Sequence, residues 1–380
     1  MQALSGKWPD THSEEVKRGI TIKLGYADVS IRKCESCGKF TTAEKCGACG
    51  GASREVRKIS LVDSPGHETL MATVIAASAI MDGALFVIAA NEKCPQPQTQ
   101  EHLMVLEGAG IRNVVIAQNK VDLVTPLQAR EHYKQIRSFL ADSPFPNAPI
   151  IPTAANAGVN IGALLAAIES AIPTPERDRS ADPRFFVARS FDVNKPGADW
   201  AKLGGGVVGG SLSRGVLREG DEVQIVPGAL RQSAKGKESY EALATKIVSL
   251  HAGGSRAAEA APGGLVGVST ELDSAVTKAD SLVGCMLGKN LPPAVNSITL
   301  EYAVLKRVLE AFPASFIQNE PLVLGIGTAA TLGFVEAAKT KKSTLTLSLK
   351  KPVCAERGDR AAVMRRSGNR WRLYATAKIV

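Results

Sequence analysis

Four cysteines near the start of the chain have the spacing of a metal site. Cys34, Cys37, Cys46 and Cys49 form two Cys-x2-Cys pairs, and eight residues separate the pairs. Four thiolates at this spacing can surround one ion tetrahedrally and leave no coordination position open, so the site would be structural. Zinc is the default ion and rubredoxin-type iron is the alternative, whereas disulfides in a secreted protein are the interpretation without metal.

A second segment has residue types that could handle a phosphate and its magnesium ion. The sequence DSPGH, which starts at Asp63, contains Gly66 and ends at His67, follows the apolar run at 59–63. A carboxylate at the end of a strand can hold Mg²⁺ through water, and a glycine just beyond it lets the backbone approach a γ-phosphate. Taken alone, the segment is equally compatible with a simple turn between a strand and a helix.

A third polar segment could read a guanine base. Asn119, Lys120 and Asp122 follow the apolar run at 113–118. A carboxylate accepts hydrogen bonds from guanine N1–H and from its 2-amino group, which adenine does not offer. We therefore expect Asp122 to select guanine, Asn119 to support the loop and contact the base, and the aliphatic stem of Lys120 to cover it. The alternative is a polar loop without a ligand.

Two further segments complete the candidate set. Thr153, Ala154 and Ala155 follow the apolar run at 148–152, and their backbone amides could reach the guanine oxygen, while Thr21 offers a hydroxyl that could coordinate Mg²⁺. Ligands of open parallel sheets bind beyond the carboxyl ends of the strands, so these segments together predict one guanine-nucleotide site. The phosphate-binding pattern Gly-x4-Gly-Lys-Ser/Thr does not occur in the printed sequence.

Hydrophobic periodicity indicates the elements that must position these residues. Over residues 1–175, continuous apolar runs of the kind found in buried parallel strands alternate with stretches of helical character. This alternation predicts an α/β domain with a mostly parallel sheet. The expected strands are 59–63, 84–90, 113–118 and 148–152, and the expected helices are 68–81, 98–109, 126–141 and 160–171.

The pattern changes after the Pro-rich, charged segment 172–183, which we interpret as a linker. Beyond it, short runs of Val, Ile, Leu and Thr punctuated by glycine replace the helical patterns. They predict all-β structure, with barrels as the expected form. A second break near 291–293 divides this part, so two β-barrel domains are expected over 182–290 and 291–380.

Composition narrows the class of protein. The 380 residues are 44% hydrophobic and 22% charged, which excludes a disordered chain and a coiled coil. Seven cysteines are too few for a disulfide scaffold and fit a reducing compartment with one metal site. Aromatic residues make up only 5%, which argues against a ring-stacking surface for single-stranded nucleic acid as the main binding device.

Positive charge is concentrated at the C-terminal end of the chain. Residues 291–380 contain 14 Lys/Arg and 6 Asp/Glu, so they carry +8 of the net charge of +9. An excess confined to one domain favours a polyanionic partner that docks there, with the neighbours Arg365 and Arg366 as representative contacts. The alternative is a solvated basic face without a partner.

Together, these motifs resemble the gamma subunit of archaeal and eukaryotic translation initiation factor two, a family of translational GTPases. The resemblance runs through KRGITIKLGYA at 17–27, the four cysteines, DSPGHETLMAT at 63–73, IAQNKVDL at 116–123 and RSFDVNKPG at 189–197, and it covers essentially the whole chain. The family is otherwise similar to elongation factor Tu, from which a cysteine knuckle inside the first switch region separates it.

The resemblance implies a P-loop GTPase-like α/β domain with a zinc knuckle, followed by two β-barrels, and it implies GTP or GDP, Mg²⁺ and Zn²⁺ as bound groups. It also implies a cytoplasmic carrier of methionylated initiator tRNA to the small ribosomal subunit, with the basic C-terminal domain helping to hold tRNA or the ribosome. The carrier would be the core of a heterotrimer whose alpha subunit docks on the second domain and whose beta subunit docks on the first.

The family also implies a role for each candidate residue. These roles are magnesium binding by Gly19 and Thr21, switch-two contacts by Asp63 and Gly66, positioning of the attacking water by His67, guanine recognition by Asn119, Lys120 and Asp122, and closure of the base pocket by Ala154, Ala155 and Asn156.

Two departures from the family pattern keep alternatives open. The base-closing motif of the family reads Ser-Ala, whereas this chain has Ala154 and Ala155, whose backbone amides can still serve. The family's first strand and Gly-Lys-Thr loop would precede Met1, so we expect a chain that starts late and by itself binds GTP weakly or not at all. A nucleotide-free scaffold, or pseudo-GTPase, is the second hypothesis. Another tRNA-carrying GTPase, such as a selenocysteinyl-tRNA factor, is the third, and the cysteine knuckle argues against it.

Overall fold

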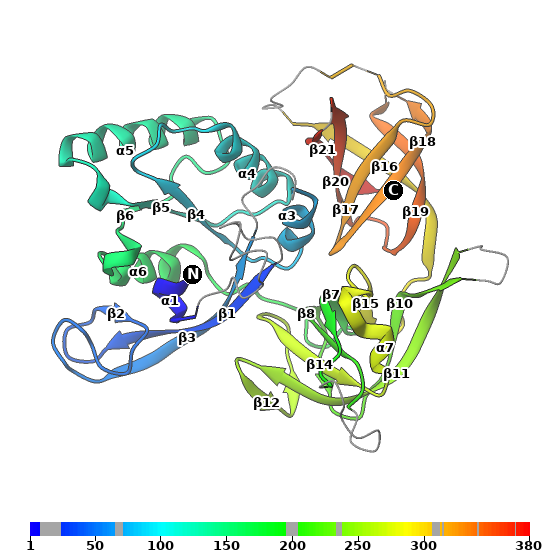
Figure 1. Ribbon diagram of the computed structural model, residues 1–380, viewed down its shortest axis with the longest axis horizontal. Helices are drawn as coiled ribbons and strands as arrows, with labels where there is room; N and C mark the ends of the chain where they lie inside the picture. Colours follow the sequence, from blue (N-terminus) through cyan, green and yellow to red (C-terminus); the bar gives the residue numbers. More distant parts are fainter. Residues whose placement is uncertain are drawn as a thin grey trace. The chain divides into compact units, whose positions relative to one another are not determined.

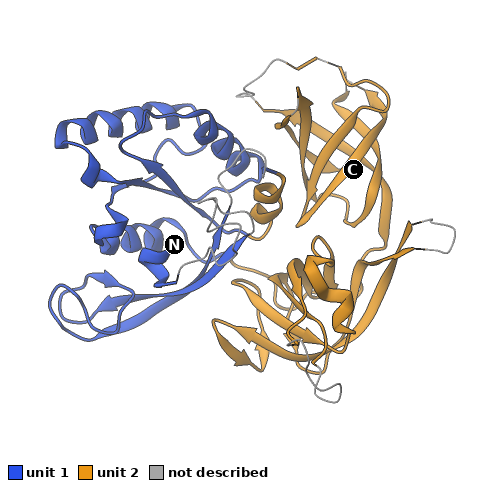
Figure 2. Ribbon diagram, viewed as in Figure 1, with its two compact units in different colours: residues 1–71, 81–175 blue, residues 72–80, 176–380 orange. Residues whose placement is uncertain are grey.

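The computed structural model divides the chain into two compact units. The described residues are 1–7, 24–64, 71–194, 204–232, 238–305, 312–313, 315–339, 342–368 and 370–380. Residues 1–71 and 81–175 form the first unit, and residues 72–80 and 176–380 form the second (Figure 2). Each unit has large hydrophobic clusters of its own.

The first unit combines strands and helices (Figure 1). Its described elements are α1 (Gln2–Ser5), β1 (Gly25–Cys34), β2 (Phe40–Thr41), β3 (Ser53–Asp63), β4 (Ala84–Ala89), α4 (Pro97–Gly108), β5 (Val114–Asn119), α5 (Pro126–Ala141), β6 (Ile150–Pro152) and α6 (Ile161–Ala171), with 3₁₀ turns at Val121–Leu123 and Ala155–Ala157. Strands β4, β5 and β6 form a parallel sheet in that order, and β2, β1 and β3 form a separate antiparallel sheet.

The central strand of the parallel sheet is buried on both faces. Val114 and Ile116 of β5 enter one hydrophobic cluster with residues of α4 and α5, whereas Val115 and Ala117 enter another with residues of α6. A strand covered on both sides needs apolar residues at successive positions rather than at alternate ones. The continuous apolar run at 113–118 predicts this strand correctly.

Helix α5 shows how local sequence sets the ends of an element. Thr125 and Gln128 form a capping box, in which the Thr125 side chain accepts from the Gln128 amide, and Pro126 occupies the first helical turn. His132, Ile136 and Leu140 recur every four residues and are buried. This is the longest described helix, with 16 residues, fewer than the roughly 20 apolar residues that a membrane-spanning helix needs.

Strands β1 and β3 correct one expectation. The sequence predicts a buried parallel strand at 59–63, but these residues end β3, which pairs antiparallel with β1 from Gly25↔Asp63 to Cys34↔Ser53. After Ser53, every residue of β3 is exposed or half-buried. The apolar run 59–63 is therefore only partly covered, as in a sheet with one solvated face.

The second unit contains α3 and two bodies of β-structure. Its described elements are α3 (Met71–Ser78), β7 (Arg184–Phe191), β8 (Val207–Arg214), β9 (Leu217–Arg218), β10 (Glu222–Gln232), β11 (Glu238–Ala252), β12 (Ser255–Ala257), β13 (Glu259–Ala260), β14 (Val266–Thr270), α7 (Ser274–Thr277), β15 (Met286–Gly288), β16 (Ala294–Val304), β17 (Pro321–Ile326), β18 (Ala329–Lys339), β19 (Thr344–Cys354), β20 (Arg360–Ser367) and β21 (Arg370–Ile379).

The first β-body is a ring of six antiparallel strands. The order β10-β15-β7-β8-β14-β11 closes through the pairing of β10 with β11, and β12 extends β11. The glycine-rich sequence at 204–210 has a steric cause: a Cβ at Gly205 would lie 1.8 Å from Thr270 O, and one at Gly210 would lie 1.9 Å from Phe186 O. Only glycine allows backbones to approach this closely.

The second β-body is a closed barrel in the order β16-β19-β18-β17-β20-β21. Its interior is one continuous cluster that includes Leu300, Leu324, Leu345 and Val363, all fully buried. A closed barrel has no free edge strand, because every strand pairs with a neighbour on both sides. The predicted class, an α/β GTPase-like domain followed by two β-barrels, is confirmed.

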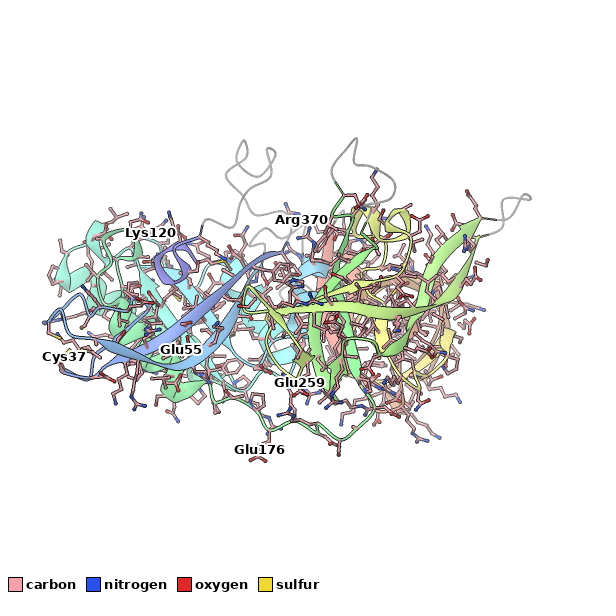
Figure 3. The ribbon with its side chains drawn as sticks, turned by 90° about the horizontal axis from the view of Figure 1, so that it is seen from below. Cys37, Glu55, Lys120, Glu176, Glu259 and Arg370 are labelled. Atoms are coloured by element: carbon pink, nitrogen blue, oxygen red, sulfur yellow. The ribbon has the colours of Figure 1, made fainter. Side chains whose placement is uncertain are left out.

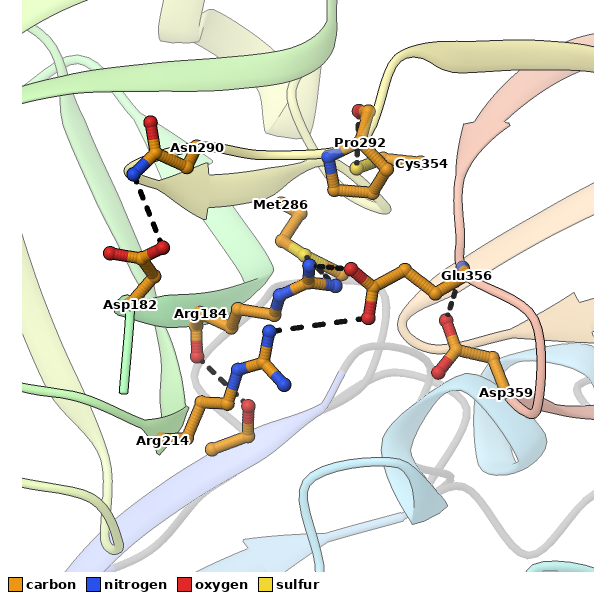
Figure 4. A network of polar contacts seen from close by, with 10 residues as sticks. Asp182, Arg184, Arg214, Met286, Asn290, Pro292, Cys354, Glu356 and Asp359 are labelled. Atoms are coloured by element: carbon orange, nitrogen blue, oxygen red, sulfur yellow. Dashed lines mark hydrogen bonds and ion pairs between the residues drawn. The ribbon is translucent and has the colours of Figure 1, made fainter. Parts of the chain in front are cut away.

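Polar contacts join the two barrels within the second unit (Figure 4). Arg184, at the start of β7, forms an ion pair with Glu356 in the connection between β19 and β20. Lys351 Nζ also donates across to Val283 O of the first barrel at 3.0 Å, while Cys354 Sγ donates to Pro292 O in the segment that leads into β16 at 3.3 Å. The end of the second barrel that carries the β19–β20 connection is therefore occupied by the first barrel.

Candidate nucleotide and metal sites

Hydrogen bonds join the loops that follow β5 and β6. Asn119, the last residue of β5, accepts at Oδ1 from the Ala155 amide (3.1 Å) and from the Thr153 hydroxyl (3.3 Å). The Thr153 amide donates to Gln118 O at 2.8 Å, and the Val121 amide donates to Thr153 O at 3.2 Å. Two loops from different parts of the sequence are thereby held as one surface.

The residues expected to contact a base lie on these joined loops. Lys120 has a left-handed backbone (φ 62°), which turns the chain sharply after β5, and Asp122 lies in the 3₁₀ turn that follows. The side chains of Lys120, Asp122 and Asn156 are exposed, whereas Ala154 is buried. The exposed Asp122 carboxylate is an acceptor of the kind that guanine N1–H and the 2-amino group require. On the second loop, the amides of Ala154 and Ala155 already donate within the chain, to Val159 O and to Asn119 Oδ1.

Gln118, the residue before Asn119 in the sequence, forms a buried polar pair with His132 of α5. The sequence did not predict this pair. Gln118 Nε2 donates to Ala129 O (2.8 Å) and to His132 Nδ1 (3.1 Å). His132 is 4% exposed, and burial lowers the pKa of its imidazole. Among the described residues, its Nε2 has no hydrogen-bond partner. The only sequence signal was a polar residue at an otherwise apolar position of α5.

The structure places one further candidate and leaves four undescribed. Asp63 ends β3 and is half-buried. Gly19, Thr21, Gly66 and His67 lie outside the described residues. Their roles in magnesium binding, phosphate contact and water positioning therefore stay predictions.

The four cysteines converge on one point at the outer end of the β1–β3 sheet, where Figure 3 shows Cys37. All four Sγ atoms lie within 4.8 Å of one another, with 3.5 Å between Cys34 and Cys49 and 3.6 Å between Cys37 and Cys46. Zinc–sulfur bonds of about 2.3 Å correspond to tetrahedron edges of about 3.8 Å. The four thiols thus fit a tetrahedral ion such as zinc.

The two cysteine pairs share one backbone design. Gly38 N donates to Cys34 O (3.0 Å), and Gly50 N donates to Cys46 O (2.8 Å) in the same way. Both glycines have φ of 71°, which a residue with a side chain rarely adopts. This repetition explains why each pair is followed by a glycine.

Backbone amides in these turns favour the thiolate at Cys34 and Cys46, whereas, despite the amide of Gly51, the sulfurs of Cys34 and Cys37 raise the pKa of the Cys49 thiol. The amides of Cys37 and Ser36 hold the pKa of the Cys34 thiol at about 6, and those of Ala48 and Cys49 lower the pKa of the Cys46 thiol. Thiolates are the form that binds metal, so these turns are suited to a cation.

The basic C-terminal barrel corrects the choice of Arg365 as a surface contact. Arg365 is 2% exposed, and its guanidinium donates to both carboxylate oxygens of Glu320 at 2.7 and 3.1 Å. It also lies over the rings of Phe312, Phe316 and Tyr374, 4.5–5.7 Å from their centroids. This arginine stabilises the barrel, while its neighbour Arg366 is exposed. Successive residues of a strand face opposite sides, but a basic doublet in sequence does not show which of its two members is buried.

Comparison with known families agrees with the architecture. Residues 2–174 match the family described as elongation factor Tu GTP binding domain, and residues 296–379 match initiation factor eIF2 gamma, C terminal. Solved structures with the same fold include a bacterial selenocysteine-specific elongation factor EF-Sec (TM-score 0.74, 22% identity), which covers 100% of this chain and of which this chain spans 55%. Elongation factor SelB from Methanococcus maripaludis, bound to the GTP analogue GppNHp, has a TM-score of 0.70 at 21% identity. The match covers 94% of this chain and 73% of the SelB chain.

Closer relatives share half of the sequence over nearly the whole chain. Translation initiation factor 2 subunit gamma of Methanococcus vannielii is 50% identical over 379 residues, which cover 97% of this chain and 92% of the relative. The proteins of the same name from Methanothermobacter thermautotrophicus and Pyrococcus horikoshii are also 50% identical, with 98% of this chain and 93% and 91% of the relatives covered. The chain therefore belongs to the translation initiation factor 2 gamma subunit family, a branch of the translational GTPases.

Proposed function

We propose that this chain is the GTP-dependent carrier of methionylated initiator tRNA to the small ribosomal subunit. The observation that carries the proposal is the junction at Asn119, whose Oδ1 accepts from the Ala155 amide and the Thr153 hydroxyl and so holds together the two loops expected to contact the base. A loop held in its binding conformation before the ligand arrives loses less entropy on binding. Family membership supplies the rest of the argument, because the relatives are named as initiation factors.

Guanine selectivity follows from the chemistry of Asp122. Its carboxylate accepts from N1–H and from the 2-amino group of guanine, whereas adenine presents an acceptor at N1 and would leave the carboxylate unpaired. Asn119 supports the loop, and the stem of Lys120 covers one face of the base. Ala154, Ala155 and Asn156 close the pocket from the second loop.

Phosphate chemistry is assigned to residues outside the described part of the chain, together with Asp63. In this proposal Gly19 and Thr21 ligate Mg²⁺, Asp63 and Gly66 form the second switch, and His67 positions the water that attacks the γ-phosphate, with GDP and phosphate as products. Bound Mg²⁺ would neutralise charge on the phosphates. Zn²⁺ is assigned to Cys34, Cys37, Cys46 and Cys49, where it would hold the first switch region without taking part in hydrolysis.

The partners follow from the name of the relatives, because a gamma subunit implies other subunits. We assign an alpha subunit to the first β-barrel, a beta subunit to the first unit, and initiator tRNA with the small ribosomal subunit as the RNA partners, all in the cytoplasm. The third hypothesis, a selenocysteinyl-tRNA factor, is not favoured, since that likeness reaches only 22% identity against 50% for the initiation factors.

Filter binding tests the proposal directly. Methionylated initiator tRNA and methionylated elongator tRNA would be titrated with a purified chain that carries the full first domain, in the presence of GTP or GDP. We expect the initiator form with GTP to bind at least tenfold more tightly than the other three combinations. Equal binding of both tRNAs in both nucleotide states would contradict the carrier function and favour the scaffold hypothesis.

A further inference from the structure

One arginine anchors the segment that joins the two units, residues 172–183, on the side of the first unit. Arg57 lies in β3, and its Nη1 donates to Ile172 O at 2.7 Å and to the Thr174 hydroxyl at 3.3 Å. Its Nη2 lies 2.9 Å from Glu169 Oε2 of α6, and the two side chains are 17% and 25% exposed. Arg57 therefore holds the end of α6 and the first residues of the joining segment against β3.

Packing fixes the same point from a second direction. Ile172 lies against Gly83, just before β4, and a Cβ at Gly83 would lie 2.5 Å from Ile172 Cγ2. The Ile172 amide donates to Ile168 O at 3.0 Å and so closes the last turn of α6. The joining segment therefore leaves the first unit from a place that β3, α6 and the start of β4 fix together.

The other end of the joining segment is anchored to the first barrel. Asp178 O accepts from the amide of Gly215, which follows β8, at 2.7 Å. Gly215 has φ of 75°, and a Cβ there would lie 2.5 Å from Pro183 Cα, so the segment lies directly on the barrel backbone. Between the two anchored stretches the chain has only residues 175–177, of which Glu176 is exposed (Figure 3).

A connection this short and stiff passes on the direction of its first residues. Pro173 and Pro175 restrict the backbone on either side of Thr174. At its other end, β3 leads from Arg57 to Asp63, a residue expected to contribute to the magnesium and γ-phosphate site, and six residues of strand span about 20 Å. An extended strand cannot lengthen further, so a displacement of Asp63 when GTP replaces GDP reaches Arg57 and the start of the joining segment.

We propose that Arg57 is a positioning residue through which the nucleotide bound to the first unit controls tRNA affinity. This inference rests on the proposed function and deepens it, because it names the contact by which β3 acts on the segment that leads to the barrels. A guanidinium suits this task, since its planar fork of donors can hold a carbonyl, a hydroxyl and a carboxylate at the same time. Coupling of this kind between two sites typically changes affinity by about 5- to 150-fold.

Substitutions of Arg57 in a chain that carries the full first domain test the proposal. Arg57→Met keeps the aliphatic stem and removes all three contacts, whereas Arg57→Lys keeps the charge on a single nitrogen. Lys58→Met is the control, because Lys58 is exposed on the opposite face of the same strand. The affinity for methionylated initiator tRNA would be measured with GTP and with GDP, after thermal unfolding has shown that each variant is folded.

We expect the ratio of the two tRNA dissociation constants, with GDP over GTP, to fall about threefold or more in Arg57→Met, while GTP affinity without tRNA stays within about twofold of the wild type. Arg57→Lys should recover part of the ratio, and Lys58→Met should keep all of it. A purely structural defect would weaken binding in both nucleotide states and leave the ratio as it is. An unchanged ratio in Arg57→Met, or an equal fall in Lys58→Met, overturns the inference.

Two further measurements test the path through the joining segment. Adding Glu169→Gln to Arg57→Met should lower the ratio no further, because both side chains act through one contact. Hydrogen exchange of residues 168–176, which needs neither nucleotide nor tRNA, should be faster in Arg57→Met than in the wild type and in Lys58→Met. A further fall of the ratio in the double variant, or equal exchange in all three chains, overturns the path.

The same titrations separate this inference from the proposed function. A wild-type chain that binds initiator tRNA equally with GTP and GDP contradicts the carrier function, and the role of Arg57 falls with it. A wild-type chain that discriminates, with an Arg57→Met variant that discriminates equally well, overturns the role of Arg57 alone and leaves the carrier function standing.

Discussion

The cysteine knuckle, which lies between β1 and β3 and consists mostly of turns, and the C-terminal barrel are held by different forces. Between residues 35 and 52 the only buried residue is Cys46, and the segment closes through four thiols and two glycine turns. The barrel instead encloses a continuous apolar cluster within six strands that leave no free edge. A segment with so little apolar burial cannot offset the entropy of ordering its chain, whereas the barrel can.

This difference predicts opposite sensitivities. The knuckle should depend on an ion from outside the chain, and the barrel should depend on complementary groups inside it. The loops around Asn119 belong to the second kind, because hydrogen bonds within the chain hold them. A substitution in the knuckle should therefore change metal content, one inside the barrel should change stability, and one in the loops around Asn119 should change the choice of ligand.

The largest expected effect is the loss of metal from the knuckle. Cys37→Ser removes one exposed thiolate, and structural zinc sites contribute about 10–16 kcal/mol of apparent binding free energy. We expect zinc to fall from one ion per chain to well below one by elemental analysis, with loss of amide protection in residues 34–53. Protection of β16–β21 should not change.

Ser36→Ala is the matched control for this variant, because it alters the same exposed turn and keeps all four thiols. It should retain the ion. If the unaltered chain, purified under native conditions, holds no metal, the knuckle is stable without an ion. The contrast drawn between the knuckle and the barrel would then be wrong.

The next effect in size concerns the interior of the barrel. Arg365→Met leaves Glu320, whose side chain is 15% exposed, without its partner, and breaking a buried ion pair in this way costs about 3–5 kcal/mol. Hydrogen exchange in β17 and β20 should report the loss, and the metal content should stay unchanged. Glu320→Gln in the same chain should restore part of the stability.

Arg366→Ala serves as the control for Arg365→Met, because its side chain is on the exposed face of the same strand. Its effect on stability should stay within about 0.5 kcal/mol. Equal destabilisation by the two substitutions would mean that Arg365 does not have the structural role assigned to it.

Arg365 also shows where prediction from sequence reached its limit. Continuous apolar runs correctly predicted β4, β5 and β6, and the cysteine spacing correctly predicted the clustering of the thiols, because both patterns are local. The burial of Arg365 depends on Glu320, on two rings in the segment before β17 and on one ring of β21, which spacing does not reveal. The run at 59–63 failed for a similar reason: whether a strand is covered on both faces depends on its neighbours.

The base-reading loops offer a smaller test, in which ligand choice should change and stability should not. Asp122→Asn replaces an acceptor of two hydrogen bonds with an amide, and the loss of a hydrogen bond between charged and neutral groups costs about 1.5–3 kcal/mol. We expect the preference for GTP over ATP to fall by that amount in calorimetric titrations of a chain that carries the full first domain.

Asp142→Asn makes the same change of charge at the exposed end of α5 and is the control. It should leave nucleotide preference as it is. Unchanged discrimination in Asp122→Asn would show that another group reads the base, and unfolding of this variant would show that Asp122 supports the loop rather than the ligand.

The smallest expected effect comes from His132, which lies in the core behind the base-reading loops. Burial lowers the pKa of this imidazole below its ordinary value of 6.5, so the folded chain keeps it neutral where the unfolded chain takes up a proton. The contribution to stability is thus complete above pH 6.5 and is lost as pH falls below it, by at most about 1.4 kcal/mol per pH unit. Protonation would also oppose the bond that Gln118 Nε2 donates to His132 Nδ1.

We expect His132→Gln to flatten the pH dependence of amide protection in β5 and α5 between pH 7.5 and 5.5, whereas His251→Gln, at an exposed position of the second unit, should not. Parallel pH profiles for the wild-type chain and His132→Gln would show that the imidazole is protonated without cost, and the loops around Asn119 would then be insensitive to the pair beneath them.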